Sequence, residues 1–269
     1  MTREVERCAA LLGMGAAILA AGCADTPGTP LAVAAARNNA DEIRRLLAEG
    51  QTPNERAGAW TPLIWAARSG ALSAVATLLD AGAEIDRPDR ASSQWTPLQH
   101  AIHRQERHVA RLLLDRGANP NASAAPGSLT PLLMAADDPD PTTVTLLLDY
   151  GADPHVGGEW GDTPLSRAVS GGALSDIDRP LFGGCRPATV RALLAYDPTL
   201  RVTHNAAGLE ALWWARFHGC VDVLQLIGER PTKPGQTVVS GVGILRQELR
   251  EIPRGGPAPT PAKDALSRP

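Results

Sequence analysis

Residues 96–121 read TPLQHAIHRQERHVARLLLDRGANPN, and this segment contains the signals for two short helices. Thr96 suits the position before a helix, because its hydroxyl can accept a hydrogen bond from an unpaired backbone N–H. Pro97 suits the first helical position, where its missing N–H costs nothing. Gly117 follows the leucines of the second helix, at the place where a left-handed cap favours glycine. The segment therefore predicts a helix–turn–helix unit.

The same pattern returns along the chain at a near-constant period. Thr-Pro-Leu begins at five positions with intervals of 32, 35, 34 and 33 residues: Thr29, Thr61, Thr96, Thr130 and Thr163. A glycine lies 21 residues after each of the first four: Gly50, Gly82, Gly117 and Gly151. Such a period is typical of stacked repeats, which bury their apolar faces against one another. Stacked repeats build extended binding surfaces, so the pattern favours a protein-binding function over an enzymatic one.

The units resemble the ankyrin repeat. The sequences T-P-L-I-W-A-A from Thr61 and T-P-L-L-M-A-A from Thr130 match that family's T-P-L-H-x-A signature. The sequence L-L-L-D-Y-G-A-D-P from Leu146 is similar to the family's repeat ends. The resemblance covers about residues 29–230. It implies a mainly α ankyrin-repeat solenoid of five to six units, each a helix–turn–helix with a β-hairpin loop.

The later units depart from the pattern. Units are expected to start near residues 29, 61, 96, 130, 163 and 210, with an insertion at about residues 172–187 in the fifth. The sixth unit is aligned on Leu212-Trp213-Trp214-Ala215 and lacks Thr-Pro, so it is interpreted as a terminal cap that faces water on one side. Residues 231–254 are predicted to form a C-terminal capping segment, in which 237–251 could be a strand or a helix. Residues 255–269 are rich in Pro, Gly and Ala and are predicted to be disordered.

The first 22 residues are predicted to be a lipoprotein signal peptide. The apolar run from Ala9 to Ala21 is too short for a membrane-spanning helix but suits the core of a signal peptide. It ends on L-A-A-G-C, which resembles a bacterial lipobox and implies lipidation of Cys23, with residues 23–28 as a linker. By analogy with that class, Asp25 is one position too late for inner-membrane retention, which favours the outer membrane, facing the periplasm. The alternative is an apolar N-terminal cap helix in a cytoplasmic protein.

Composition and motifs favour a binding protein without a cofactor. The formal net charge is −3, so nothing suggests a nucleic-acid partner. The chain lacks the common motifs of hydrolases, phosphate-binding loops and zinc proteases, and no enzymatic activity is expected. His100 and His103 are interpreted as structural or surface residues and not as metal ligands. The carboxylates from Asp137 to Asp140 are interpreted as a solvated turn and not as a Ca²⁺ site.

Two cysteines remain in the predicted mature chain outside the lipidation site. Cys185 and Cys220 each follow a glycine near the turn between two helices of neighbouring units. In an oxidising compartment they could form a disulfide, and the alternative is two separate small buried residues.

A partner is expected to dock where ankyrin repeats usually bind, on the hairpin tips and the exposed side of the first helices. Trp and Arg are the residue types most enriched at binding hot spots. The candidate residues are those just before Thr-Pro or seven to eight residues after Thr, together with one tryptophan near the fifth hairpin tip: Trp60, Arg68, Trp95, His103, Arg104 and Trp160. The alternative is that each tryptophan packs on its neighbouring unit, and Trp65, Trp213 and Trp214 are interpreted as packing residues.

The leading functional hypothesis is a monomeric, membrane-tethered lipoprotein that faces the periplasm and binds a protein partner. A narrower form is an immunity protein that neutralises a secreted toxin. The alternatives are an envelope-stress accessory linked to peroxide defence, an enzyme or small-ligand binder built on the fifth-unit insertion, and a cytoplasmic or host-targeted ankyrin module.

Overall fold

The computed structural model describes residues 27–91, 94–124, 127–158, 160–171, 184–202 and 205–229. All of them lie in the first of two compact units, Met1–Pro231, and the second unit is Thr232–Pro269. The predicted signal peptide, Cys23, the capping segment 231–254 and the tail 255–269 lie outside the described residues.

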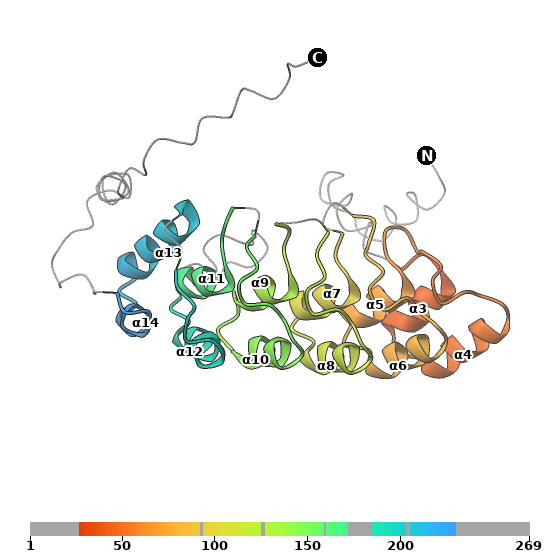
Figure 1. Cartoon of the computed structure of the whole chain (residues 1–269). Coiled ribbons are helices and arrows are strands. Elements are labelled where there is room, and N and C mark those ends of the chain that lie inside the picture. The colour runs from red at the N-terminus through yellow and green to blue at the C-terminus, as the bar shows by residue number, and fades with distance from the viewer. Residues whose placement is uncertain are drawn as a thin grey trace, which may run out of the picture. The chain divides into compact units, whose positions relative to one another are not determined.

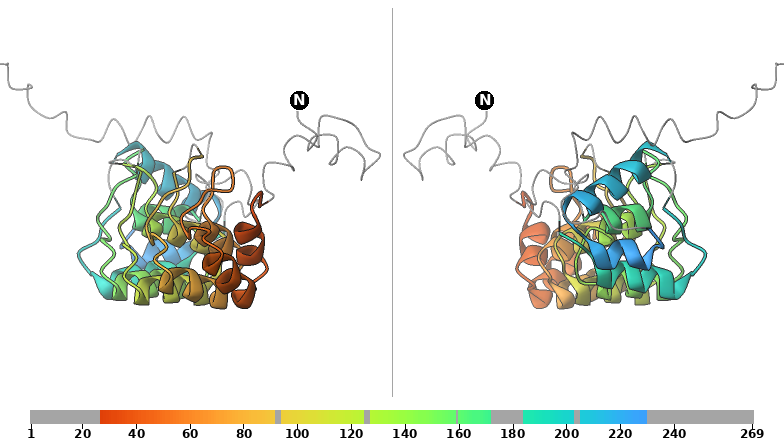
Figure 2. Two further views of the ribbon diagram at one scale, coloured as in Figure 1. Left: turned by 90° about the vertical axis from the view of Figure 1, so that its right-hand side faces the viewer. Right: turned by 90° about the vertical axis from the view of Figure 1, so that its left-hand side faces the viewer.

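The described chain is a series of short helices that follow one another in six pairs. First and second helices alternate: α3 (Pro30–Ala36) and α4 (Ala40–Ala48), α5 (Pro62–Arg68) and α6 (Leu72–Asp80), α7 (Pro97–His103) and α8 (Arg107–Asp115), α9 (Pro131–Ala135) and α10 (Thr142–Asp149), α11 (Pro164–Ser170) and α12 (Pro187–Tyr196), α13 (Ala206–Phe217) and α14 (Val221–Leu226). Figure 1 shows the second helices side by side in one row and the first helices above them. The connections between units project from one side of these rows in both views of Figure 2.

The repeated Thr-Pro pair sets where each first helix begins. In all five units with Thr-Pro, the threonine hydroxyl accepts a hydrogen bond from the backbone N–H three residues later, at 3.2–3.4 Å. The proline then occupies the start of the helix. Because the cap fixes the same register in each unit, equivalent side chains recur on the same face of the stack.

The sixth unit begins earlier than its sequence indicates. Its first helix starts at Ala206, and Asn205 caps it by accepting a hydrogen bond from the Gly208 N–H at 2.9 Å. The predicted start near Glu210 lies inside this helix. The helix ends at Phe217, seven residues after 210, as α5 ends at Arg68, seven residues after Thr61, so the repeat register is kept and α13 has an additional turn at its start.

Alanines and leucines fill the space between the helices. The leucine after each Thr-Pro is almost completely buried: Leu31, Leu63, Leu98, Leu132 and Leu165. Alanines such as Ala66 and Ala101 are fully buried and let neighbouring first helices approach closely. The second helices add leucines such as Leu113, which has no exposed surface. One continuous apolar core therefore runs along the stack, as expected for a repeat array.

The loops between units have the course of hairpins but little strand structure. Within the described ranges, one isolated antiparallel bridge joins Ala57 and Trp60. The loops before the third and fifth units are closed by comparable backbone hydrogen bonds, from the Asp89 N–H to the Trp95 carbonyl at 2.9 Å and from the Gly158 N–H to the Asp162 carbonyl at 2.7 Å. The architecture is the mainly α ankyrin solenoid predicted from the sequence, with the expected β-hairpins reduced to these contacts. No helix of the described part is long and apolar enough to span a bilayer.

Candidate protein-binding face

The residue before Thr-Pro and the residue seven positions after the threonine meet on one face of the stack. In the second unit, the guanidinium carbon of Arg68 lies 4.3 Å from the ring centroid of Trp60. In the third unit, the rings of Trp95 and His103 have centroids 5.0 Å apart. These are four of the six residues predicted to bind a partner, and the structure brings them together in two equivalent pairs on adjacent units.

His100 lies between these pairs and joins them. Its ring centroid is 5.6 Å from those of both Trp60 and Trp95, in edge-to-face contacts. Trp65 adds a further ring, 4.5 Å from Trp60. We refer to Trp60, Trp65, Arg68, Trp95, His100 and His103 as the aromatic cluster.

The hydrogen bonds of His100 define its protonation. Its Nε2 lies 2.8 Å from Oδ2 of Asp89, and its Nδ1 lies 3.3 Å from Nη1 of Arg68. A guanidinium can only donate, so Nδ1 must accept and the proton must be on Nε2, which donates to Asp89. Burial lowers the pKa of His100; the carboxylate of Asp89 opposes this shift and the charge of Arg68 adds to it. The ring is therefore a neutral structural link between the second and third units.

Sequence reasoning missed the part that Asp89 plays. This residue lies in the loop before the third unit, and its carboxylate is fully buried beside His100. The sequence separation of 11 residues follows no motif, so only the folded loop reveals the pair. His100 is buried within the aromatic cluster, and His103 is half-buried against Trp95. No group of three or more metal-ligand side chains is found within the described ranges.

The other two predicted binding residues differ in their surroundings. Arg104 is exposed at the end of α7, next to His103. Trp160 is 78% exposed and lies in the loop before the fifth unit. Among the described residues, no ring contact links it to the aromatic cluster, so it is a separate feature on a later hairpin.

The equivalent positions of the fifth unit hold charged residues instead of rings. Asp162 takes the place of Trp60 and Trp95 before Thr-Pro, and Arg167 takes the place of His100. Nε of Arg167 pairs with Asp162, and its Nη1 lies 3.0 Å from Oδ2 of Asp137 in the fourth unit. All three side chains are largely buried, so this cluster links two units in the way that the aromatic cluster links the second and third.

The acidic run after α9 forms the turn between two helices at the predicted place, but its carboxylates are partly buried and paired and are not solvated as the sequence suggested. Asp138 accepts a hydrogen bond from Gln105 at 2.6 Å, and Asp140 pairs with Arg107 at 2.7 Å. Asp137 pairs with Arg167. The carboxylates therefore connect the fourth unit to its neighbours on both sides.

The insertion of the fifth unit lies between its two helices. Sixteen residues separate α11 from α12, whereas three separate α5 from α6. The two ends of the segment meet: a Cβ added to Gly171 would collide with the carbonyl oxygen of Gly184. Nη2 of Arg186 also lies 3.4 Å from the Gly171 carbonyl oxygen, and its pKa is lowered chiefly by burial.

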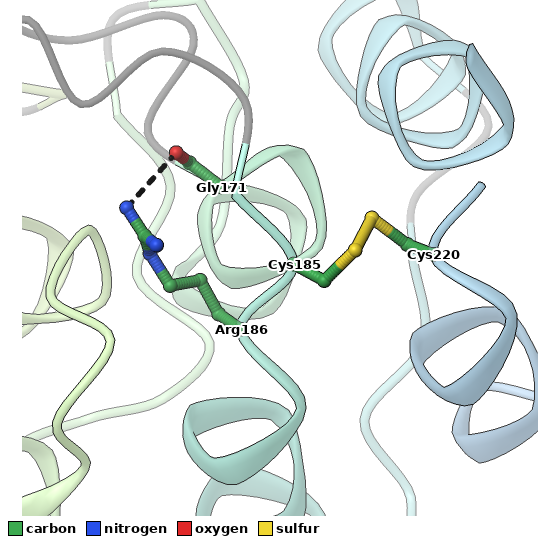
Figure 3. Close-up of a disulfide and its surroundings, with 4 residues drawn as sticks. All are labelled: Gly171, Cys185, Arg186 and Cys220. Carbon is green, nitrogen blue, oxygen red and sulfur yellow. Dashed lines mark hydrogen bonds between the residues drawn. A yellow bond between two sulfur atoms is a disulfide. The ribbon is translucent and has the colours of Figure 1, made fainter. Parts of the chain in front are cut away.

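A disulfide joins the end of this insertion to the last unit. Cys185 and Cys220 are bonded, with their Cα atoms 5.4 Å apart (Figure 3). Cys220 is buried at the start of α14, whereas Cys185 is exposed. The pairing predicted as one of two possibilities is thus present in the structure, and it holds the sixth unit against the fifth.

Comparison with known families agrees with the fold. The family described as ankyrin repeats (3 copies) matches residues 6–89, and the family described as ankyrin repeat matches residues 93–125. The first match begins inside the predicted signal peptide, in a stretch outside the described residues. A search of curated proteins gave no match. The chain therefore carries ankyrin repeats, and its described residues fold as an ankyrin-repeat solenoid.

Proposed function

We propose that the chain binds a protein partner on the face formed by the aromatic cluster and Arg104. Ankyrin repeats are protein–protein interaction modules, so the class of function follows from the fold. The observation that supports this location is the pairing of Trp60 with Arg68 and of Trp95 with His103 on adjacent units. Both tryptophans are only half-buried, and half-exposed Trp beside Arg is the composition of binding hot spots.

Arg104 gives the sharpest test of this face. Arg104→Ala changes an exposed side chain, and Arg191→Ala makes the same change on α12, in the row of second helices. Partners would be captured from envelope extracts with the purified chain and identified by mass spectrometry. We expect Arg104→Ala to retain less of the captured partner than the wild type, and Arg191→Ala to retain the same amount. Equal retention by both variants would place the contact elsewhere on the chain.

We also propose that the chain is tethered at Cys23 and faces the periplasm. The L-A-A-G-C sequence supports lipidation, and the disulfide supports an oxidising compartment, since disulfides are rare in the cytoplasm. Labelled fatty acid should be incorporated into the wild type and not into Cys23→Ala, whose precursor should stay unprocessed. An unlabelled wild type that keeps residues 1–22 would instead favour an N-terminal cap helix, in line with the family match from residue 6.

The narrower proposal is immunity to a toxin delivered into the periplasm. The tether would hold the aromatic cluster near the membrane, where such a toxin acts. Deletion of the gene should make cells sensitive to killing by toxin-secreting sister cells. Sensitivity to peroxide without sensitivity to sister cells would favour the second candidate, an envelope-stress accessory protein.

A further inference from the structure

Three arginines in the first three units have no acidic partner among the described residues. Arg37 and Arg104 lie at equivalent places, each eight residues after the threonine of its unit, at the ends of α3 and α7. Arg90 lies in the loop between the second and third units, next to the buried Asp89. All three are exposed, and none forms an ion pair with another described residue.

Several arginines of the second helices form ion pairs. Arg45 of α4 pairs with Glu42 and Glu49, and Arg107 of α8 pairs with Asp140. Arg116, just after α8, pairs with Asp80 at 2.7 Å. Most arginines of the second-helix row are thus paired, with Arg111 and Arg191 as exceptions, whereas Arg37, Arg90 and Arg104 form no ion pair among the described residues.

The loop arginines are also held close to one another. Arg56 donates to the carbonyl oxygens of Ala59 at 2.9 Å and Pro88 at 3.0 Å, which fixes its guanidinium between two loops. Its pKa is lowered by burial first, and then by the positive charges of Arg87 and Arg90, whereas Asp89 and Glu84 oppose the shift. Arg87 is itself paired with Glu84 at 2.7 Å. Arg56, held by these hydrogen bonds, and the exposed Arg90 add positive charge to this part of the loops, where incoming negative charge is favoured.

This positive character ends at the fourth unit. The positions seven and eight residues after the threonine carry Arg68 in the second unit and His103 and Arg104 in the third. In the fourth unit the same two positions carry Asp137 and Asp138. The face therefore has a basic, aromatic part over the first three units and a boundary where its charge reverses.

We propose that the partner contributes an acidic segment of its chain, which lies over the first three units. This proposal rests on the proposed function and adds the chemistry of the partner. Carboxylates of the segment pair with Arg37, Arg90 and Arg104, and an apolar side chain packs against Trp60 and Trp95. Complementary charge steers such an encounter and selects against basic partners.

The test uses random 16-residue peptides displayed on phage, selected on the purified full-length chain. Enriched peptides are then measured against the wild type, the double variant Arg90→Glu/Arg104→Glu and the control Arg191→Glu. We expect the enriched peptides to carry a net negative charge. Their affinity for the double variant should be at least about tenfold lower than for the wild type, and their affinity for the control should be unchanged. Their affinity should also fall as NaCl is raised, because exposed charges are screened.

Three results would overturn the proposal. Enriched neutral or basic peptides that bind the double variant as well as the wild type, but lose affinity in Trp60→Ala, would refute the acidic segment and leave the proposed binding face intact. Peptides that bind the double variant and Trp60→Ala with the same affinity as the wild type would count against the binding face as well. A selection that enriches no peptide would likewise count against both.

Discussion

The guanidinium of Arg68 lies over the indole ring of Trp60, 4.3 Å from its centroid, and the same group donates to His100 of the next unit. One side chain therefore contacts a candidate binding residue and also links two repeats. Docking and stacking are not separate roles on this face. A substitution in the aromatic cluster should affect both the affinity and the free energy of unfolding.

Trp60→Ala should lower both stability and partner affinity. The variant loses the ring contacts to Trp65 and His100 and the cation–π contact with Arg68, which together should cost about 1–3 kcal/mol. Denaturant titration gives the free energy of unfolding, and calorimetry with the captured partner gives the affinity. Trp60→Phe keeps a ring and is the matched control. Lost stability with intact affinity would assign Trp60 to the scaffold alone.

Trp160→Ala should separate the two effects. The side chain is 78% exposed, so its removal should change the free energy of unfolding by no more than about 0.5 kcal/mol. If the partner reaches the fifth hairpin, affinity should fall while the thermal midpoint stays constant. Unchanged affinity would restrict the binding face to the aromatic cluster and its surroundings.

The neutral His100 makes the fold sensitive to acid. The unfolded imidazole binds a proton as pH falls through about 6.5, whereas the folded ring resists protonation because burial lowers its pKa. The unfolded state then holds more protons, so stability should decrease as pH falls below that value. In His100→Gln this part of the pH dependence should disappear, and in the control His108→Gln, at an exposed site on α8, it should remain. Identical slopes for wild type and His100→Gln between pH 7 and 5.5 would contradict the neutral assignment.

Loss of the disulfide should loosen the last unit. Cys185→Ser should cost about 2–4 kcal/mol, because the bond restricts the unfolded chain and anchors α14 to the fifth unit. Hydrogen exchange should show the loss of protection concentrated in α13 and α14. Wild type treated with reductant should behave like the variant. In protein processed at Cys23, which lacks Cys8 and has its Cys23 thiol lipidated, two titratable thiols without reductant would show that the bond does not form.

Leu113→Ala tests the core of the second-helix row. The side chain is completely buried, and the cavity should cost about 2–5 kcal/mol. Leu112→Ala removes the same atoms from a neighbouring residue that is only partly buried, so its cost should be smaller. Because contacts in a repeat array are local, damage from Leu113→Ala should centre on the second to fourth units. A cost below about 1 kcal/mol would contradict the burial of this residue.

The sequence predicted the parts of the fold that depend on local signals. Thr-Pro and the glycine 21 residues later mark the helix ends, because capping and left-handed backbone are properties of single residues; Gly117, for example, has φ 90°. The start of α13 was missed. Asn205 caps this helix as effectively as a threonine would, but it belongs to no repeat signature.

The candidate site was predictable only in outline. Equivalent positions in successive repeats must share a face, so Trp60 and Trp95 were expected on one face together with Arg68 and His103. Their pairing within each unit is seen only in the structure. The link through His100 and Asp89 was not expected either, because it depends on how a loop folds back onto the next helix. The replacement of the rings by Asp162 and Arg167 in the fifth unit is visible in the sequence, but their pairing requires the structure.

The closeness of Gly171 and Gly184 has a practical consequence for engineering. A segment whose ends meet at one point can change length without moving the helices on either side, since closing a longer loop adds little free energy. The gap between α11 and α12 is therefore a place where foreign sequence could be grafted, with the disulfide at Cys185 holding its base. The repeat array would then serve as a scaffold that presents an exchangeable peptide segment at a defined position.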